Sequence, residues 1–211
     1  MGKIKQGILG GFSGKVGPVI GSSWKGKAVM KAQALSYNDR NSEQQQQQRM
    51  KFGLIGKFVS SIIGFVNVGF RKRAVGMTAP NAAVSCNIDT AITGTWPNYQ
   101  LDYTLTLVSD GPVDLPYSPN ATADGTTLSL TWADNSGMGN AETDDKVMVL
   151  VYNPTKNQTI YNTNLAERNE RNGTLTLPTA WTGDTVNVWM AMVRPSSGDT
   201  SKSTFLASLP L

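Results

Sequence analysis

The sequence predicts a mainly β protein of the α+β class, in which Gly-rich β-hairpins and one or two helices precede an immunoglobulin- or fibronectin-like β-sandwich. The 211 residues include 21 glycines and only 16% charged residues, which is typical of β-rich chains with many turns. The C-terminal half alternates apolar and polar residues over short segments, and one helical apolar stripe precedes it. A chain of this length can bury one large core or two small ones.

Residues 1–37 are expected to form short strands joined by glycine turns. Glycines interrupt this stretch every few residues, and apolar residues such as Val16 and Val19 stand between them. Short hairpins or an extended arm fit this pattern best. Residues 10–16 look like a phosphate-binding loop, but Leu9 and Val16 replace its first glycine and its magnesium-binding hydroxyl, so an NTPase site is not expected.

A helix is predicted over residues 42–68, where Ser42 and Gln45 form a capping-box pattern at the start. Apolar residues then recur at spacings of three and four, which marks one face of a helix: Phe52, Ile55, Val59, Ile62 and Val66. This face is expected to be buried or to contact another subunit. A membrane span over residues 52–70 is the alternative, which Lys57 and the basic residues at both ends disfavour.

A second helix is predicted over residues 78–93. Thr78 is its expected N-cap, Pro80 lies in its first turn, and Gly94 follows its end. Cys86 in this segment has apolar neighbours, which favours a buried structural thiol over a reactive one.

The rest of the chain is predicted to be all β, with a domain boundary between a basic N-terminal arm, residues 1–95, and a sandwich domain, residues 96–211. Seven strand candidates alternate in polarity and are separated by Asn, Asp, Gly and Pro, which indicates a sandwich. They are residues 99–108, 126–133, 146–153, 158–163, 172–177, 185–193 and 203–207. Trp132 and Trp189 are expected in its core.

Charge is divided unevenly along the chain. Residues 1–75 contain 13 Lys and Arg against two acids, a net charge of +11, and residues 76–211 contain six against 13, a net charge of −7. This asymmetry indicates an anionic partner for the N-terminal part or head-to-tail self-association. The candidate contact residues are Lys15, Trp24, Lys25, Lys27, Lys31, Arg71, Lys72 and Arg73. Trp24 is included because an aromatic ring among lysines is a combination used on nucleic acids.

The composition disfavours an enzyme. The chain contains no histidine and one cysteine, which removes the commonest acid–base catalyst, the commonest transition-metal ligand and cysteine-based zinc sites. The acidic loop with Asp134, Glu142, Asp144 and Asp145 lacks the ligand order of an EF-hand and is expected to be solvated, with Ca²⁺ binding as the alternative. No catalytic residue, cofactor or metal is assigned, and no small-molecule substrate is expected.

Several segments resemble a bacterial family of unknown function with phage- and prophage-associated members. The first, residues 10–27, contains Gly-Phe-Ser-Gly-Lys-Val-Gly, and the second is the Gln-rich stretch 42–52. Residues 92–99, 130–137 and 149–154 resemble the same family. The resemblance implies no catalytic residue and no cofactor.

These features predict a non-enzymatic structural or assembly protein that acts through protein–protein contacts, as a homo-oligomer or a larger assembly. The alternative is a nucleic-acid-associated protein whose basic arm binds phosphates without reading sequence. A membrane-anchored module is less favoured. The start of the chain lacks the apolar run of a secretory signal, so a cytoplasmic protein is expected, with a virion or another assembly as the alternative location.

Overall fold

The computed structural model describes residues 3–4, 10–24, 27–34, 36 and 40–211. The expected mainly β, α+β fold is confirmed. Contacts divide the chain into two compact units, Met1–Ser42 and Glu43–Leu211. The helices therefore group with the sandwich, whereas the sequence had placed the domain boundary after residue 95.

The N-terminal unit is an antiparallel sheet with the strand order β1-β2-β3-β4. Its strands are β1 (Lys3–Ile4), β2 (Phe12–Val16), β3 (Val19–Trp24) and β4 (Lys27–Ala32). Gly17, between β2 and β3, has a φ of 56°, a left-handed conformation that glycine adopts without steric strain. The glycine-turn hairpins expected from the sequence are therefore present.

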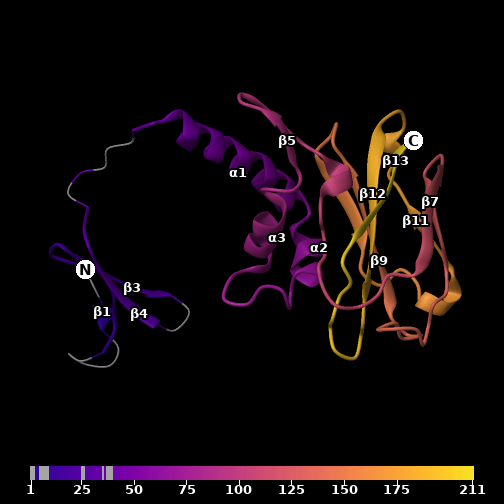
Figure 1. Ribbon diagram of the computed structural model, residues 1–211, viewed down its shortest axis with the longest axis horizontal. Coiled ribbons are helices and arrows are strands. Elements are labelled where there is room, and N and C mark those ends of the chain that lie inside the picture. Colours follow the sequence, from indigo (N-terminus) through magenta and orange to yellow (C-terminus); the bar gives the residue numbers. More distant parts are fainter. Residues whose placement is uncertain (1–2, 5–9, 25–26, 35, 37–39) are drawn as a thin grey trace. The chain divides into compact units, whose positions relative to one another are not determined.

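The second unit contains a sandwich of two antiparallel sheets, one with the order β11-β8-β7 and one with the order β10-β9-β12-β13 (Figure 1). The strands are β7 (Tyr117–Asp124), β8 (Thr127–Ala133), β9 (Lys146–Asn153), β10 (Gln158–Asn162), β11 (Asn172–Thr176), β12 (Thr185–Val193) and β13 (Thr204–Pro210). The first, second and fifth of these strands share one sheet, and the third, fourth, sixth and seventh share the other. This is the arrangement of immunoglobulin- and fibronectin-like sandwiches.

One of the seven predicted strands is wrong. Residues 99–108 form no sandwich strand: β6 (Asn98–Leu101) pairs with β5 (Ile92–Thr95) in a separate hairpin, and a 3₁₀ turn follows at Tyr103–Leu105. The seventh sandwich strand is instead β7, which contains Pro119 and few large apolar residues. β7 lies at a sheet edge, where proline and polar side chains are tolerated, and its sequence therefore resembles a loop.

Two apolar cores lie on opposite faces of the four-stranded sheet. The core between the sheets contains, from β8, β9 and β12, Leu128, Leu130, Trp132, Val147, Val149, Val151, Val186, Val188, Met190 and Met192. The alternate residues of β9 and β12, among them Leu150 and Trp189, pack in a second core with the helices. Trp132 and Trp189 are 5% and 0% exposed, which confirms both as core residues.

Three helices cover the outer face of the four-stranded sheet (Figure 1): α1 (Glu43–Ser61), α2 (Ile63–Gly69) and α3 (Ala79–Asn87). The single helix predicted over residues 42–68 is broken, and α1 and α2 meet at 88°. Ser61 Oγ donates a hydrogen bond to the Phe58 carbonyl at 2.7 Å, a local bond that often bends helices. The bend allows both helices to pack against the same sheet.

Four of the five residues in the predicted helical stripe are buried in the helical core. Ile55, Val59, Ile62 and Val66 are at most 3% exposed, whereas Phe52 is 57% exposed. Within the part of the chain that the structure describes, no single helix is long and apolar enough to span a membrane. Only α1 and α2 taken together have that length and apolarity, and this pair is bent. Four residues of the stripe therefore pack against the four-stranded sheet of the same chain, and Phe52 is the stripe residue that remains exposed.

α3 is shorter than the helix predicted over residues 78–93. Thr78 is its N-cap, as expected, and its side chain accepts a hydrogen bond from the first turn. The helix ends at Asn87, whose buried side chain donates to the Leu107 carbonyl and accepts from the Leu107 N–H. Cys86 is half-buried against the helical core, where full burial was expected.

An aromatic cluster joins α1 to the sheet. The Phe58 ring meets Tyr152 edge-on with ring centres 5.2 Å apart, and the Trp189 ring lies 5.9 Å from Phe58 and 5.4 Å from Phe205. Burial in this cluster raises the pKa of the Tyr152 hydroxyl to about 12, so the side chain stays neutral over the usual pH range. The helices are thus an integral layer of the second unit.

Candidate interaction surface

One face of the N-terminal sheet gathers four of the predicted contact residues. The strand register aligns Lys15 on β2 with Ile20 on β3 and Lys31 on β4, and it pairs Trp24 with Lys27. Directly opposed residues of neighbouring strands point to the same side of a sheet, as do alternate residues of one strand. Lys15, Trp24, Lys27 and Lys31 therefore lie on one side, which we call the basic face.

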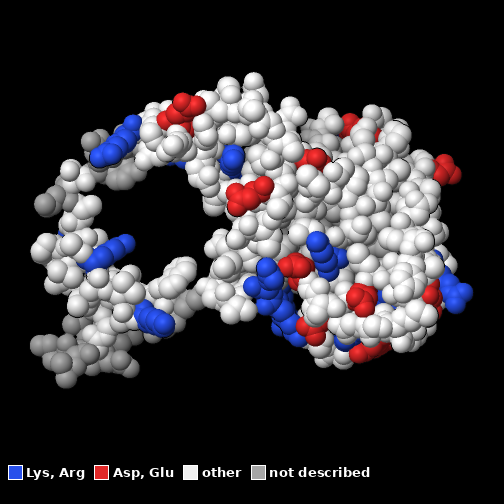
Figure 2. Space-filling model, in the orientation of Figure 1, with Lys and Arg blue, Asp and Glu red and all other residues white. Residues whose placement is uncertain are grey.

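The side chains of the basic face are accessible. All three lysines are exposed, and Trp24 is 64% exposed although most large aromatic side chains are largely buried. The first acidic residue of the chain is Asp39, so residues 1–38 contain no carboxylate that could neutralise these lysines. On the side drawn in Figure 2, the described part of this unit shows basic and no acidic side chains. Lys25, the remaining predicted lysine of this unit, lies outside the described residues.

The opposite side of the same sheet, the apolar face, is uncharged. By register its residues are Phe12, Gly14, Val16, Val19, Gly21, Ser23, Ala28, Met30 and Ala32. The Phe12 ring packs on Gly21, where an added side-chain carbon would lie 2.5 Å from the ring. Met30 and Val16 stay 71% and 53% exposed, and a hollow of about 240 Å³ opens beside Phe12 and Met30. This face is therefore only partly covered.

The predicted contact residues after α2 lie against the sandwich. Lys72 Nζ is 2.7 Å from Asp199 Oδ1, and Arg73 Nε is 3.4 Å from Asp110 Oδ2. The hydrogen bond from Lys72 lowers the pKa of the Asp199 carboxyl below its ordinary value. Arg71 is exposed next to them. Because acids of the same unit pair with Lys72 and Arg73, these two residues hold the end of α2 to the sandwich.

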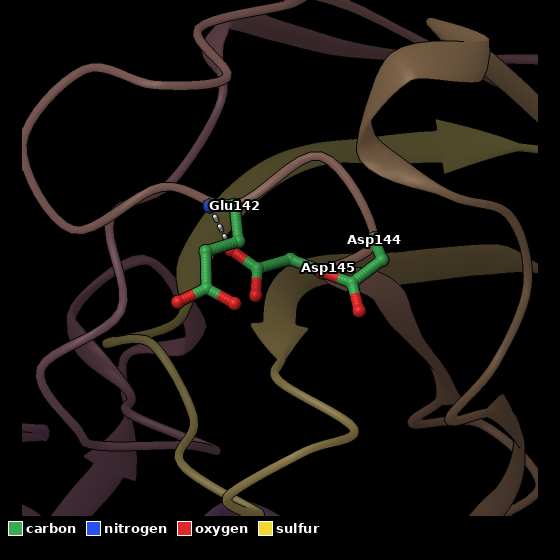
Figure 3. A group of neighbouring side chains, drawn as sticks. All are labelled: Glu142, Asp144 and Asp145. Carbon is green, nitrogen blue, oxygen red and sulfur yellow. Dashed lines mark hydrogen bonds between the residues drawn. The ribbon is translucent and has the colours of Figure 1, made fainter.

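The acidic loop differs from the solvated loop that the sequence predicted. Glu142, Asp144 and Asp145 lie side by side (Figure 3), but Asp145 is fully buried while the other two are exposed. The Asp145 carboxylate accepts hydrogen bonds from Arg168 Nη2 at 2.8 Å and Arg194 Nε at 3.0 Å, and from the Glu142 N–H at 2.9 Å. Two arginines thus occupy both oxygens of the carboxylate, and they would repel a bound cation.

Arg168, which the sequence analysis missed, is the centre of this polar cluster. Its side chain is 0% exposed, and its nitrogens also donate to Asn135 Oδ1 at 2.6 Å and to the carbonyls of Asp114 and Glu142 at 2.7 and 3.1 Å. Its own carbonyl accepts a hydrogen bond from Trp132 Nε1 at 2.7 Å. These bonds join separate loops at one end of the sandwich. An arginine flanked by acids and asparagines looks like a surface residue in sequence, so no local pattern could have revealed it.

Residues 11–207 of the chain match a family that is described as "Family of unknown function (DUF6266)". No curated protein matches the chain. The matched region contains β2 to β4, the helices and the sandwich strands up to β13. Strands β2 to β4 of the N-terminal sheet therefore lie within the matched residues, and β1 precedes them.

Proposed function

The chain belongs to DUF6266, a family of unknown function, and we propose that it is a non-enzymatic structural protein that assembles with further copies of itself through its N-terminal sheet. The apolar face carries this proposal, because Met30 and Val16 remain 71% and 53% exposed on it. A sheet gains stability when one face is buried against a second layer. Every element in the described part of the N-terminal unit is a strand, so we assign that layer to another copy.

The distribution of charge supports a head-to-tail contact. Residues 1–42 contain seven Lys and Arg against one acid, a net charge of +6, and residues 43–211 contain 12 against 14, a net charge of −2. The N-terminal unit of one copy would then meet the larger unit of the next, where Phe52 is an exposed apolar residue. Such a contact is heterologous, and it closes into a ring or continues as a filament. The resemblance to phage-associated proteins fits a virion-like assembly formed in the cytoplasm.

Size-exclusion chromatography with light scattering tests the proposal. The full chain should form oligomers whose mass rises with concentration, and the double variant Val16→Ser/Met30→Ser should shift to the monomer mass. High salt should weaken the assembly without abolishing it, because salt screens charges but leaves apolar burial in place.

The matched control is Val75→Ser/Met138→Ser, which removes the same two residue types at positions 82% and 58% exposed in the larger unit. This control should keep the wild-type mass. A wild-type chain that remains monomeric at every concentration and salt would overturn the proposal.

A further inference from the structure

We propose that the basic face of the N-terminal sheet binds single-stranded nucleic acid, with Lys15, Lys27 and Lys31 contacting phosphates and Trp24 stacking on a base. The inference uses the side of the sheet opposite the apolar face, so it does not require the apolar contact that carries the proposed assembly. It rests on the register of the three strands, the exposure of Trp24 and the charge of the surrounding surface.

The register spreads the three lysines over a compact area. Lys15 and Lys31 flank Ile20 across two strand spacings, which places their backbones roughly 10 Å apart. Lys27 lies four residues from Lys31 along β4, roughly 13 Å away. Their ammonium groups can therefore reach several phosphates of one short strand. Lysine binds phosphate as a flexible point charge, which suits contact with a backbone rather than with particular bases.

Trp24 differs from the tryptophans of the sandwich. Trp132, Trp181 and Trp189 are at most 5% exposed, whereas Trp24 is 64% exposed and stands directly opposite Lys27. An indole ring held on a strand beside a cation offers a flat stacking surface next to a phosphate contact. Every base has such a face, so this combination binds single strands with little sequence preference.

The composition of the basic face favours a nucleic acid over an anionic membrane. A helix or sheet that enters the lipid interface presents a broad apolar surface with basic residues around it. The basic face also contains Ser13 and Ser22, and the only apolar residues on it besides Trp24 among the paired residues of β2 to β4 are Ile20 and Val29. The large apolar residues Phe12 and Met30 are on the other side of the sheet.

Fluorescence anisotropy of a labelled oligodeoxythymidine of about 12 nucleotides measures the binding. For the full chain, the logarithm of affinity should fall with log salt at a slope of about −2 or steeper, because each phosphate contact contributes about −0.7 on a single strand. Lys27→Ser/Lys31→Ser should flatten the slope by about 1.4. The control Lys57→Ser/Lys202→Ser removes the same charge from exposed positions of the larger unit and should leave the slope unchanged.

Substitutions of Trp24 test base stacking separately from the contribution of charge to binding. Trp24→Ala should weaken binding about 5- to 150-fold, and Trp24→Phe should restore most of it because the ring can still stack. Oligonucleotide binding should quench part of the tryptophan fluorescence in the wild type but not in Trp24→Phe. Circular dichroism of each variant verifies that the sheet remains folded.

Four outcomes would overturn the inference. They are equal affinity for the single strand and its duplex, full competition by inorganic polyphosphate, unchanged binding by Trp24→Ala, and stronger binding to phosphatidylserine vesicles than to the oligonucleotide. Loss of oligomers in the Val16→Ser/Met30→Ser variant with retained oligonucleotide binding would separate this inference from the proposed assembly.

Discussion

Arg168 and Asp145 form an ion pair in which both side chains are fully buried, with Arg168 Nη2 2.8 Å from Asp145 Oδ2. Arg194 Nε approaches the other carboxylate oxygen at 3.0 Å, so one carboxylate is shared by two arginines. Removing a single partner from a buried pair is strongly destabilising, because the remaining charge is left without compensation.

Asp145→Asn should lower the free energy of unfolding by about 3–5 kcal/mol, because it leaves two buried cations without their shared carboxylate. Urea unfolding measures the loss. The control is the exposed neighbour, Asp144→Asn, which should change stability by less than about 0.5 kcal/mol. Equal losses in the two variants would show that the buried pair does not stabilise the sandwich.

Trp132→Ala should destabilise the protein by about 3–5 kcal/mol, because it empties part of the core between the sheets. It also removes the donor that bonds the Arg168 carbonyl. Trp24→Ala removes the same side chain from an exposed position and should leave the melting transition of the sandwich unchanged. A loss below about 1 kcal/mol for Trp132→Ala would contradict its place in the core.

Gly69→Ala should destabilise the protein by about 1–3 kcal/mol. A methyl group at Gly69 would lie 2.7 Å from the Val108 carbonyl oxygen and 2.9 Å from Ser109 Cβ, and backbone atoms cannot move aside cheaply. The control is Gly56→Ala in α1, where the methyl group meets open space. That variant should gain about 0.5–1 kcal/mol from better helix propensity. Thermal melts in which both variants shift in the same direction would argue against the close backbone contact at Gly69.

Acid should weaken the contact between α2 and the sandwich. The hydrogen bond from Lys72 lowers the pKa of Asp199 from its ordinary value of 3.8, so the carboxylate stabilises the fold above that value and the stabilisation is lost as the pH falls through the lower pKa. Asp199→Asn should therefore melt at a lower temperature than the wild type at pH 7, and the difference should shrink toward pH 2. A difference that is constant with pH would show that the ion pair is not its cause.

The fragment 43–211 should unfold cooperatively as a β-rich monomer, because it keeps both layers that cover the four-stranded sheet. The fragment 96–211 lacks α1 to α3 and would expose the outer face of β9 and β12, including Leu150 and Trp189. We expect it to aggregate or to melt without cooperativity. Circular dichroism melts of both fragments decide the matter, since a cooperative melt of 96–211 would support a boundary after residue 95.

The basic face combines a feature visible in the sequence with one that only strand pairing creates. Its sequence context of lysines predicted a contact residue, and the strand register then brought Lys15, Lys27 and Lys31 to the same side of the sheet. The sequence could not supply the apolar face, because the alternation of small and large residues among glycines did not reveal which strands pair. Nor could it separate Lys72 and Arg73, whose charges are compensated by acids more than 30 residues away.

The amino-acid sequence by itself determined the alternating strand β8, the apolar runs of β9 and β12 and the helical stripe from Ile55 to Val66, because hydrophobic patterning is a local property of the chain. Tertiary structure decided the rest. β7 pairs as an edge strand although it contains Pro119, and the long helix bends after Ser61. Arg168 is buried against Asp145. Each of these depends on partners distant in sequence, which supply the backbone pairing, the covering sheet face or the opposite charge that no local pattern contains.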